Sequence, residues 1–179
     1  MLTNTLRLLG EIKLAKVASG HTTSPVLAIV PMSPNHGVFG GDGLYGECKA
    51  GLETLFNRWN IESWADYVSV AGAVIGWTRG TNMMDGNDLN SYAAEQTGMR
   101  SFSTKEMAFN ILGLMTPTMT ALADQSPVWA DFNGAFQLFV DSGHTLVTIR
   151  GSLVDESASR KAIAAAALQD HTVVHQRSV

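Results

Sequence analysis

The sequence predicts an α/β fold with a parallel sheet, and three observations carry this prediction. Two nearly continuous apolar runs, residues 25–31 and 67–75, are typical of strands buried on both faces of a parallel sheet. Segments with helical spacing alternate with these runs, as βαβ units require. The 179 residues are 45% hydrophobic and 16% charged, which is apolar enough for a core and excludes a disordered chain.

The first half of the chain is expected to form a helix, a strand, a loop and a second helix. Residues 2–17 carry apolar side chains near helical spacing without a proline, which predicts an amphipathic helix. The polar residues 18–24 then form a turn into the first strand, residues 25–31. A glycine-rich loop with the sequence SPNHGVFGGDG follows, and residues 44–59 return to helical spacing.

The second strand, residues 67–75, ends at Gly76 and leads into a longer polar region, residues 77–102. Ser103 and Glu106 then stand three residues apart, the spacing of a capping box, because each can bond the other's backbone N–H. This pair predicts the start of a further helix.

A third short strand is expected at residues 127–132, before the turn-forming Asn-Gly pair. The pattern weakens from residue 138 onward. There we expect a strand at residues 144–149 and a helix of high intrinsic propensity at residues 157–168. The last eleven residues are expected to fray or to depend on a neighbour.

Composition and charge exclude several classes of function. Twelve Lys and Arg are scattered along a chain of net charge −4, so we expect no nucleic-acid partner. The longest apolar run is too short for a bilayer, so no membrane partner is expected. Cys48 is the single cysteine, which favours a reducing, cytoplasmic setting. His171 and His175 lack an acidic residue between them, and we expect no metal site.

Tyr45 and Lys49 are the residues that point to chemistry. Their spacing of four places both side chains on one face of the predicted helix. An ammonium beside a phenol favours the phenolate and makes proton donation easier. Ser33 follows the first strand, where open α/β sheets bind their ligands. The alternative is a surface tyrosine beside a solvated lysine.

The order of these features resembles the second half of the short-chain dehydrogenase/reductase family. A serine after a buried strand, a glycine loop, Tyr45 and Lys49 one helical turn later, and Gly76 after the next strand all follow that family's pattern. The resemblance implies that Ser33, Tyr45 and Lys49 are catalytic. Asn4 stands where the family carries its fourth catalytic residue; its alternative role is a helix N-cap.

Three segments resemble, more narrowly, the ketoreductase domain of the type I fatty acid synthases of fungi and mycolic-acid-type bacteria. They are VPMSPNHGVFGGDGLYGECKAGLETLFNRW, GAVIGWTRGTNMM and PVWADFNGAF. This resemblance implies the C-terminal half of a Rossmann-like doubly wound parallel sheet, without the N-terminal nucleotide-binding strands. It assigns residues 1–137 to the reductase domain and residues 138–179 to a segment leading toward the next synthase domain. The chain would then be a fragment of a longer polypeptide or a truncated reading frame.

The activity implied is NADPH-dependent reduction of a 3-ketoacyl thioester on acyl carrier protein to the 3-hydroxyacyl thioester. Tyr45 would protonate the oxygen that Ser33 positions. Lys49 would lower the Tyr45 pKa and hold the nicotinamide ribose, while Asn4 would support a water relay. The cofactor-binding residues implied are Tyr45, Lys49, Ile75, Gly76, Thr78 and Thr81. Partners would be the carrier-bound substrate and the other synthase domains.

A different class of function stays open, in which the chain is a catalytically inactive structural or interaction fragment of such a synthase. The absent nucleotide-binding half favours this alternative, and the retained Asn4, Ser33, Tyr45 and Lys49 oppose it. A serine hydrolase is a more distant third, because SPNHG is not a nucleophile elbow. The methionines of residues 77–102 would cover the acyl chain or simply form core.

The 179-residue chain by itself is expected to be inactive. It offers no turn and helix N-terminus for a pyrophosphate. Its first strand would become an apolar sheet edge that promotes association. We therefore expect a poorly soluble or oligomeric chain that does not bind NADPH.

Overall fold

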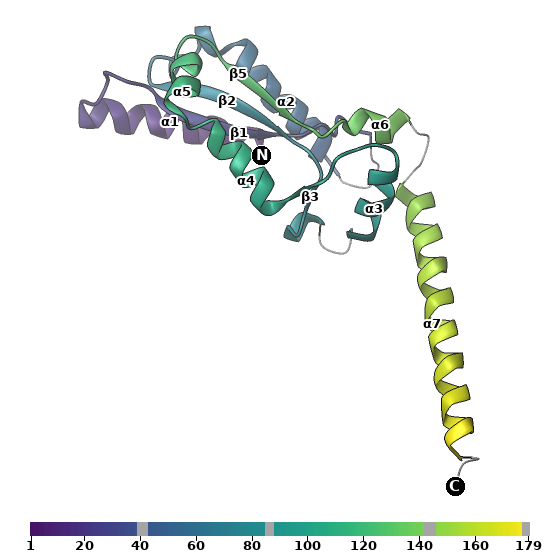
Figure 1. The fold of residues 1–179 in the computed structure, drawn as a ribbon. Helices are drawn as coiled ribbons and strands as arrows, with labels where there is room; N and C mark the ends of the chain where they lie inside the picture. The colour runs from purple at the N-terminus through teal and green to yellow at the C-terminus, as the bar shows by residue number, and fades with distance from the viewer. Residues whose placement is uncertain (39–42, 85–87, 142–145, 177–179) are drawn as a thin grey trace.

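The computed structural model describes residues 1–38, 43–84, 88–141 and 146–176. Helices and parallel strands alternate from α1 to β5, so the predicted α/β class is confirmed (Figure 1). The principal elements up to the centre of the sheet are α1 (Leu2–Ser19), β1 (Val26–Met32), α2 (Tyr45–Asn57) and β2 (Val68–Ile75). After them come β3 (Thr78–Arg79), α3 (Asp88–Gln96), β4 (Phe102–Ser103), α4 (Thr104–Gly113), α5 (Pro117–Ala123), β5 (Val128–Phe132), α6 (Phe136–Asp141) and α7 (Leu146–Gln176).

The main sheet has the strand order β1-β2-β5, and both pairings are parallel. β2 therefore lies in the centre, between two strands. The register aligns Met32 of β1 with Val74 of β2, and Ile75 of β2 with Phe132 of β5. All three strands consequently end at the same edge of the sheet.

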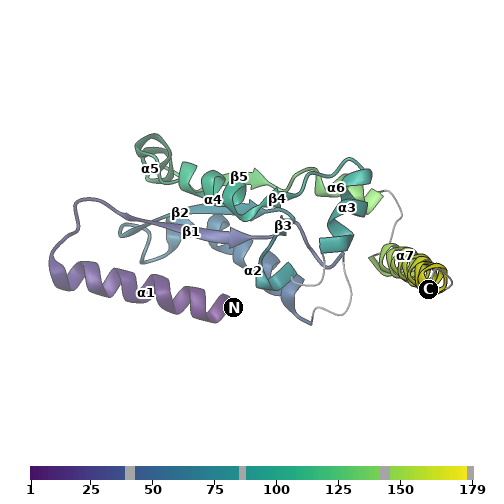
Figure 2. The same cartoon turned by 60° about the horizontal axis from the view of Figure 1, so that its bottom comes forward.

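Helices cover both faces of this sheet. Leu9 of α1 and Leu52 of α2 pack with Val70 of β2 on one face. Leu114, which ends α4, packs with Ala71 of β2 on the other face. Figure 2 shows α1 and α2 on one side of the strands and α4 and α5 on the other. The β1-to-β2 and β2-to-β5 crossovers move in the same direction over opposite faces, so they have opposite hands, although right-handed crossovers are the rule.

The helix that covers the second face begins as predicted. The Ser103 hydroxyl accepts a hydrogen bond from the Glu106 backbone N–H, and the Glu106 carboxylate accepts one from the Ser103 backbone N–H at 2.8 Å. This is the predicted capping box. α5 was not predicted, and Pro117 stands in its first turn, where a missing N–H costs nothing.

Residues 77–102, predicted only as a polar region, form a small second core together with α6. β3 and β4 pair in parallel, and the buried residues of this core are Trp77, Ala94, Met99, Phe136 and Phe139. Met99 is 2% exposed, and Met84 packs against the cluster. Of the two roles considered for the methionines of this region, Met84 and Met99 therefore have the second, that of core residues. The Met83 side chain lies outside the described residues.

The predicted strand at residues 144–149 is wrong. Residues 146–149 begin α7, and residues 144 and 145 lie outside the described part of the chain. The predicted helix at residues 157–168 is confirmed, but α7 extends it in both directions to 31 residues, through Gln176. Alanines of high helix propensity and an i,i+4 ion pair between Glu156 and Arg160 support this long helix, and no strand of the described chain pairs with it.

α7 projects away from the rest of the molecule (Figure 1) and contacts mainly α3. Among the helices that the structure describes, none combines the length and the apolar character needed to cross a membrane. The predicted division of the chain between residues 137 and 138 falls within α6 and stays a prediction.

Candidate active site

The carboxyl edge of the main sheet gathers the ends of all three strands. Ser33 follows β1, Gly76 follows β2 and Asn133 follows β5, and the strand register brings these positions to one edge. Open parallel sheets bind ligands at this edge, because the loops there diverge and leave room. The sequence-predicted serine and glycine are therefore placed together by the fold.

Ser33 lies in a closely held turn. It is 7% exposed, and its Oγ accepts a hydrogen bond of 3.1 Å from the Asn35 backbone N–H. The same loop packs against the first turn of α2, where a Cβ on Gly46 would lie 2.8 Å from the Gly37 backbone nitrogen. Only glycine at position 46 allows this approach. The loop after β1 and the start of α2 are thus fixed to each other.

Tyr45 and Lys49 share one face of α2, as predicted. The Lys49 Nζ lies 5.5 Å from the centroid of the Tyr45 ring. Lys49 is only 7% exposed, and it donates a hydrogen bond of 2.6 Å to the Pro31 carbonyl oxygen of β1. Burial lowers the pKa of Lys49 from its ordinary value, because desolvation disfavours the ammonium. The alternative of a solvated surface lysine is therefore excluded.

The residues after β2 have local structural partners. A Cβ on Gly76 would lie 2.6 Å from the carbonyl oxygens of Phe132 and Asn133, so this position requires glycine for the approach of β5. The Thr78 hydroxyl donates to the Gly76 carbonyl oxygen at 3.1 Å, and the Thr81 hydroxyl donates to the Thr78 carbonyl oxygen at 3.3 Å. These bonds shape the chain leaving β2. Any contact of these residues, or of the half-buried Ile75, with a cofactor stays a prediction.

Asn4 is exposed in the first turn of α1. The helix begins at Leu2 with Met1 as its N-cap, so Asn4 is not the N-cap that the alternative proposed. The turn that carries Asn4 lies against α2, because a Cβ on Gly51 would be 3.4 Å from the Leu2 side chain. Asn4 therefore belongs to a helix that packs on the element carrying Tyr45.

Sequence reasoning missed a cavity of about 360 Å³ beside Ser33, between the loop after β1, α2 and the end of β5. On one side His36 Nε2 lies 2.7 Å from Glu53 Oε1. On the other, Asp131 accepts hydrogen bonds from the Asn133 backbone N–H at 2.9 Å and from its Nδ2 at 2.8 Å. The rule that placed Ser33 at a strand end could have found Asn133 as well.

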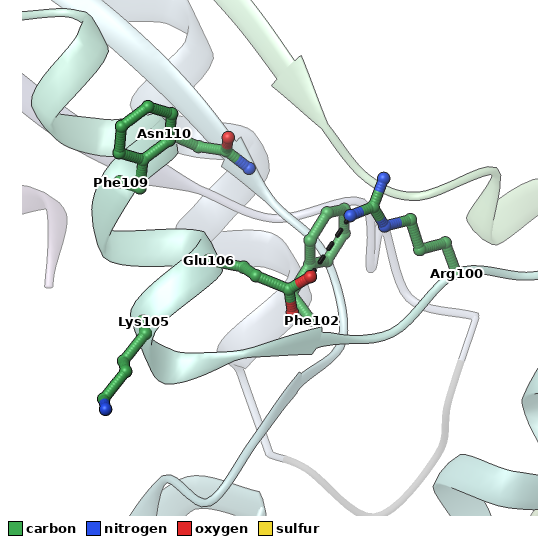
Figure 3. A pocket seen from close by; sticks show the side chains of 6 residues that line it. All are labelled: Arg100, Phe102, Lys105, Glu106, Phe109 and Asn110. Carbon is green, nitrogen blue, oxygen red and sulfur yellow. Dashed lines mark hydrogen bonds and ion pairs between the residues drawn. The ribbon is translucent and has the colours of Figure 1, made fainter.

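A second cavity, of about 470 Å³, lies at β4 and α4 (Figure 3). There the Arg100 guanidinium stands over the Phe102 ring at 5.0 Å and pairs with Glu106 at 3.3 Å. None of the predicted site residues lines this cavity, whereas Ser33 lines the smaller one, which is therefore the candidate site. Tyr45 and Lys49 line neither of these two cavities. No group of three or more potential metal ligands occurs within the described ranges.

The fold and the site together define a parallel α/β protein with a serine at its sheet edge and a tyrosine and a buried lysine on the adjoining helix α2. No protein-family model matches the chain. The chain is similar to a segment of fatty acid synthase subunit alpha of Saccharomyces cerevisiae, with 50% identity over 178 residues. The same subunit of Schizosaccharomyces pombe is 49% identical over 175 residues, and that of Candida albicans 47% over 180.

These matches cover 99%, 98% and 100% of this chain but only 9%, 10% and 9% of the relatives. The chain thus spans about a tenth of the length of these relatives. The predicted resemblance to a fungal fatty acid synthase is confirmed at this level. The ketoreductase domain and the short-chain reductase family stay predictions.

Proposed function

We propose that this chain forms the catalytic part of an NADPH-dependent 3-ketoacyl-thioester reductase within a fatty acid synthase. The observation that supports it most is the buried Lys49 beside Tyr45, one helical turn into α2 at the carboxyl edge of the sheet. Burying an ammonium is costly, and a lysine kept there at 7% exposure suits a charge that works on a neighbouring group. The similarity to fatty acid synthase subunit alpha supplies the biosynthetic setting.

In the proposed reaction the ketone carbon of the substrate gains a hydride and its oxygen gains a proton. Tyr45 donates that proton, and the Lys49 ammonium stabilises the phenolate left behind. Ser33 donates a hydrogen bond to the same oxygen and holds it in place. Asn4 supports the water that returns a proton to the site. The product is the 3-hydroxyacyl thioester.

The residues of the site fit one part of a dinucleotide cofactor, its nicotinamide ribose. An ammonium and a phenol hydroxyl on one helix face match two neighbouring ribose hydroxyls, so Tyr45 and Lys49 would hold the nicotinamide ribose. Ile75, Gly76, Thr78 and Thr81 would line the nicotinamide side. When bound, NADPH supplies the hydride, and the protein supplies orientation and proton delivery.

The proposed substrate is carried by acyl carrier protein, and the proposed partners are the other synthase domains. A cytoplasmic location accompanies this proposal, consistent with a single cysteine, Cys48, that forms no disulfide.

The test replaces the matching 178-residue segment of the Saccharomyces cerevisiae subunit alpha with this chain and measures reduction of a 3-ketoacyl thioester. Tyr45→Phe removes the proton donor and keeps the ring, so we expect activity to fall about 10²-fold or more. Tyr67→Phe, directly before β2, is the matched control and should leave activity nearly unchanged. Near-normal turnover of the Tyr45→Phe synthase contradicts the mechanism. If the synthase that carries the unsubstituted chain assembles but is inactive, the result supports the alternative that the chain is a catalytically inactive structural fragment.

A further inference from the structure

We propose that His36 and Glu53 form a positioning pair that holds the loop of Ser33 against α2. This inference rests on the proposed function and deepens it, because it names two further residues on which the alignment of the Ser33 hydroxyl depends. Both residues act through the serine, without a contact of their own to the substrate. His36 Nε2 lies 2.7 Å from Glu53 Oε1, the separation of a hydrogen bond from an imidazole N–H to a carboxylate.

One face of α2 holds the chain on both sides of Ser33. Lys49 and Glu53 are four residues apart, so their side chains lie on the same face of the helix. On that face Lys49 bonds the Pro31 carbonyl oxygen at 2.6 Å, two residues before the serine. Glu53 pairs with His36, three residues after the serine. Ser33 therefore lies between two attachments to one helix.

The pair adds a second contact between the loop and α2. At the first contact, a Cβ on Gly46 would lie 2.8 Å from the Gly37 backbone nitrogen, so the two backbones touch there. Glu53 lies about 10 Å further along the helix axis. A single contact between two backbones leaves the loop free to pivot about that point. The His36–Glu53 pair removes this freedom and fixes the orientation of the loop.

The Ser33 hydroxyl depends on that orientation. Its Oγ accepts a hydrogen bond of 3.1 Å from the Asn35 backbone N–H, and Asn35 Oδ1 accepts one of 3.1 Å from the Val38 backbone N–H. A hydroxyl that accepts a bond still has its own hydrogen to donate, which is the role that the proposed reaction gives it. His36 lies within this bonded turn, so its attachment to α2 aims the serine donor.

The exposure of the pair separates a positioning role from a role in folding. The side chains of His36 and Glu53 are 52% and 32% exposed. An ion pair in contact with water adds little to stability, because water screens the charges and ordering both side chains costs entropy. Loss of the pair should therefore change the rate of reduction and leave the stability of the protein almost unchanged.

The experiment measures reduction of a 3-ketoacyl thioester by the synthase whose matching segment is replaced by this chain, the segment-replaced synthase. Glu53→Ala should lower kcat about tenfold with little change in KM, because a displaced donor weakens stabilisation of the transition state. His36→Ala should lower kcat equally, and the double variant no further. Glu53→Gln keeps an acceptor for the imidazole N–H and should restore most of the loss. Glu47→Ala is the matched control, an exposed acid in the first turn of α2, and should leave kcat unchanged.

Ser33→Ala provides the readout that a merely structural role would not move. It should itself lower kcat about 10²-fold and leave a measurable rate. In that background Glu53→Ala should lower kcat by less than about twofold further, because the hydroxyl through which it acts is gone. A full tenfold loss in both backgrounds overturns the inference.

Two other results also overturn the inference. One is a near-normal kcat of Glu53→Ala in an active parent synthase, which leaves the proposed function intact. The other is a raised KM with an unchanged kcat, which indicates that the pair contacts the substrate directly. A parent synthase that does not reduce the thioester contradicts the proposed function itself and the inference with it.

Discussion

β1 and β2 are neighbouring strands with similar apolar sequences, yet they are buried to different extents. The first six residues of β2 are all buried, whereas β1 buries only Val30 and Met32. Their paired first residues show the contrast most clearly, because Val68 is fully buried and Val26 is 39% exposed. β2 has a strand on each side and helices on both faces, while β1 pairs with β2 alone among the described strands. An apolar run therefore identifies a strand without giving its place in the sheet.

The less protected of the two strands, β1, carries the candidate site. Ser33 follows β1, and the buried ammonium of Lys49 bonds the Pro31 carbonyl of the same strand. No described strand pairs with the outer edge of the apolar strand β1, and an edge of this kind pairs with a further strand. A site built at this edge agrees with the proposal that the rest of it comes from another part of a synthase.

The largest expected effect comes from making the same substitution on both strands. Val68→Ala should lower the free energy of unfolding of the 179-residue chain by about 2 kcal/mol, since it opens a cavity in the core. Val26→Ala should lower it by about 0.5 kcal/mol or less, because that side chain is already exposed. Urea denaturation at low protein concentration measures both values. Equal losses would show that β1 is as well packed as β2.

A smaller effect is expected from the N-terminal cap of α4, a helix on the second face of β2. Ser103→Ala removes the cap of α4 and should cost about 1 kcal/mol, while Lys105→Ala in the same turn should cost almost nothing. The hydrogen bonds from the Ser103 backbone and side chain lower the pKa of Glu106. Stability from this carboxylate is therefore present above the ordinary pKa of glutamate and is lost as pH falls through the lowered one.

Denaturation of both variants at neutral and acidic pH checks this prediction. The difference between the parent chain and Ser103→Ala should shrink in acid. A difference that is the same at both pH values would show that the Ser103 hydroxyl does not stabilise the Glu106 carboxylate.

The smallest expected effect comes from Lys49, whose ammonium bonds the Pro31 carbonyl near the carboxyl end of β1. In the folded chain burial lowers the pKa of Lys49, so the unfolded chain binds more protons between the lowered and the ordinary value. The Lys49 contribution to stability therefore rises as pH increases through this window. Lys49→Met keeps the stem without the charge, so its stability relative to the parent should decline as pH rises toward the ordinary lysine pKa.

Denaturation at neutral and alkaline pH measures this decline. A constant difference would contradict a buried charge at Lys49. Lys49→Met should also lower the activity of the segment-replaced synthase. The two measurements together separate the effect of the Lys49 charge on stability from its role in the reaction.

The sequence by itself determined the local features of the protein. Apolar runs predicted β1 and β2, and the short segment before the Asn-Gly turn predicted β5. Helical spacing predicted α1 and α2, and the Ser103–Glu106 spacing predicted the start of α4. A spacing of four put Tyr45 and Lys49 on one helix face. Each of these features depends on residues a few positions apart, and such short patterns record backbone geometry directly.

Tertiary structure alone decided the rest. The open edge of β1, the burial of Lys49 against Pro31, and the cavity that joins Ser33 to Trp129 all depend on which distant segments become neighbours. The same holds for residues 146–149, whose apolar pattern fitted a strand but which form helix because no strand pairs with them in the described chain. A sequence pattern shows that a face must be covered, but which element covers it is settled only when the whole chain packs.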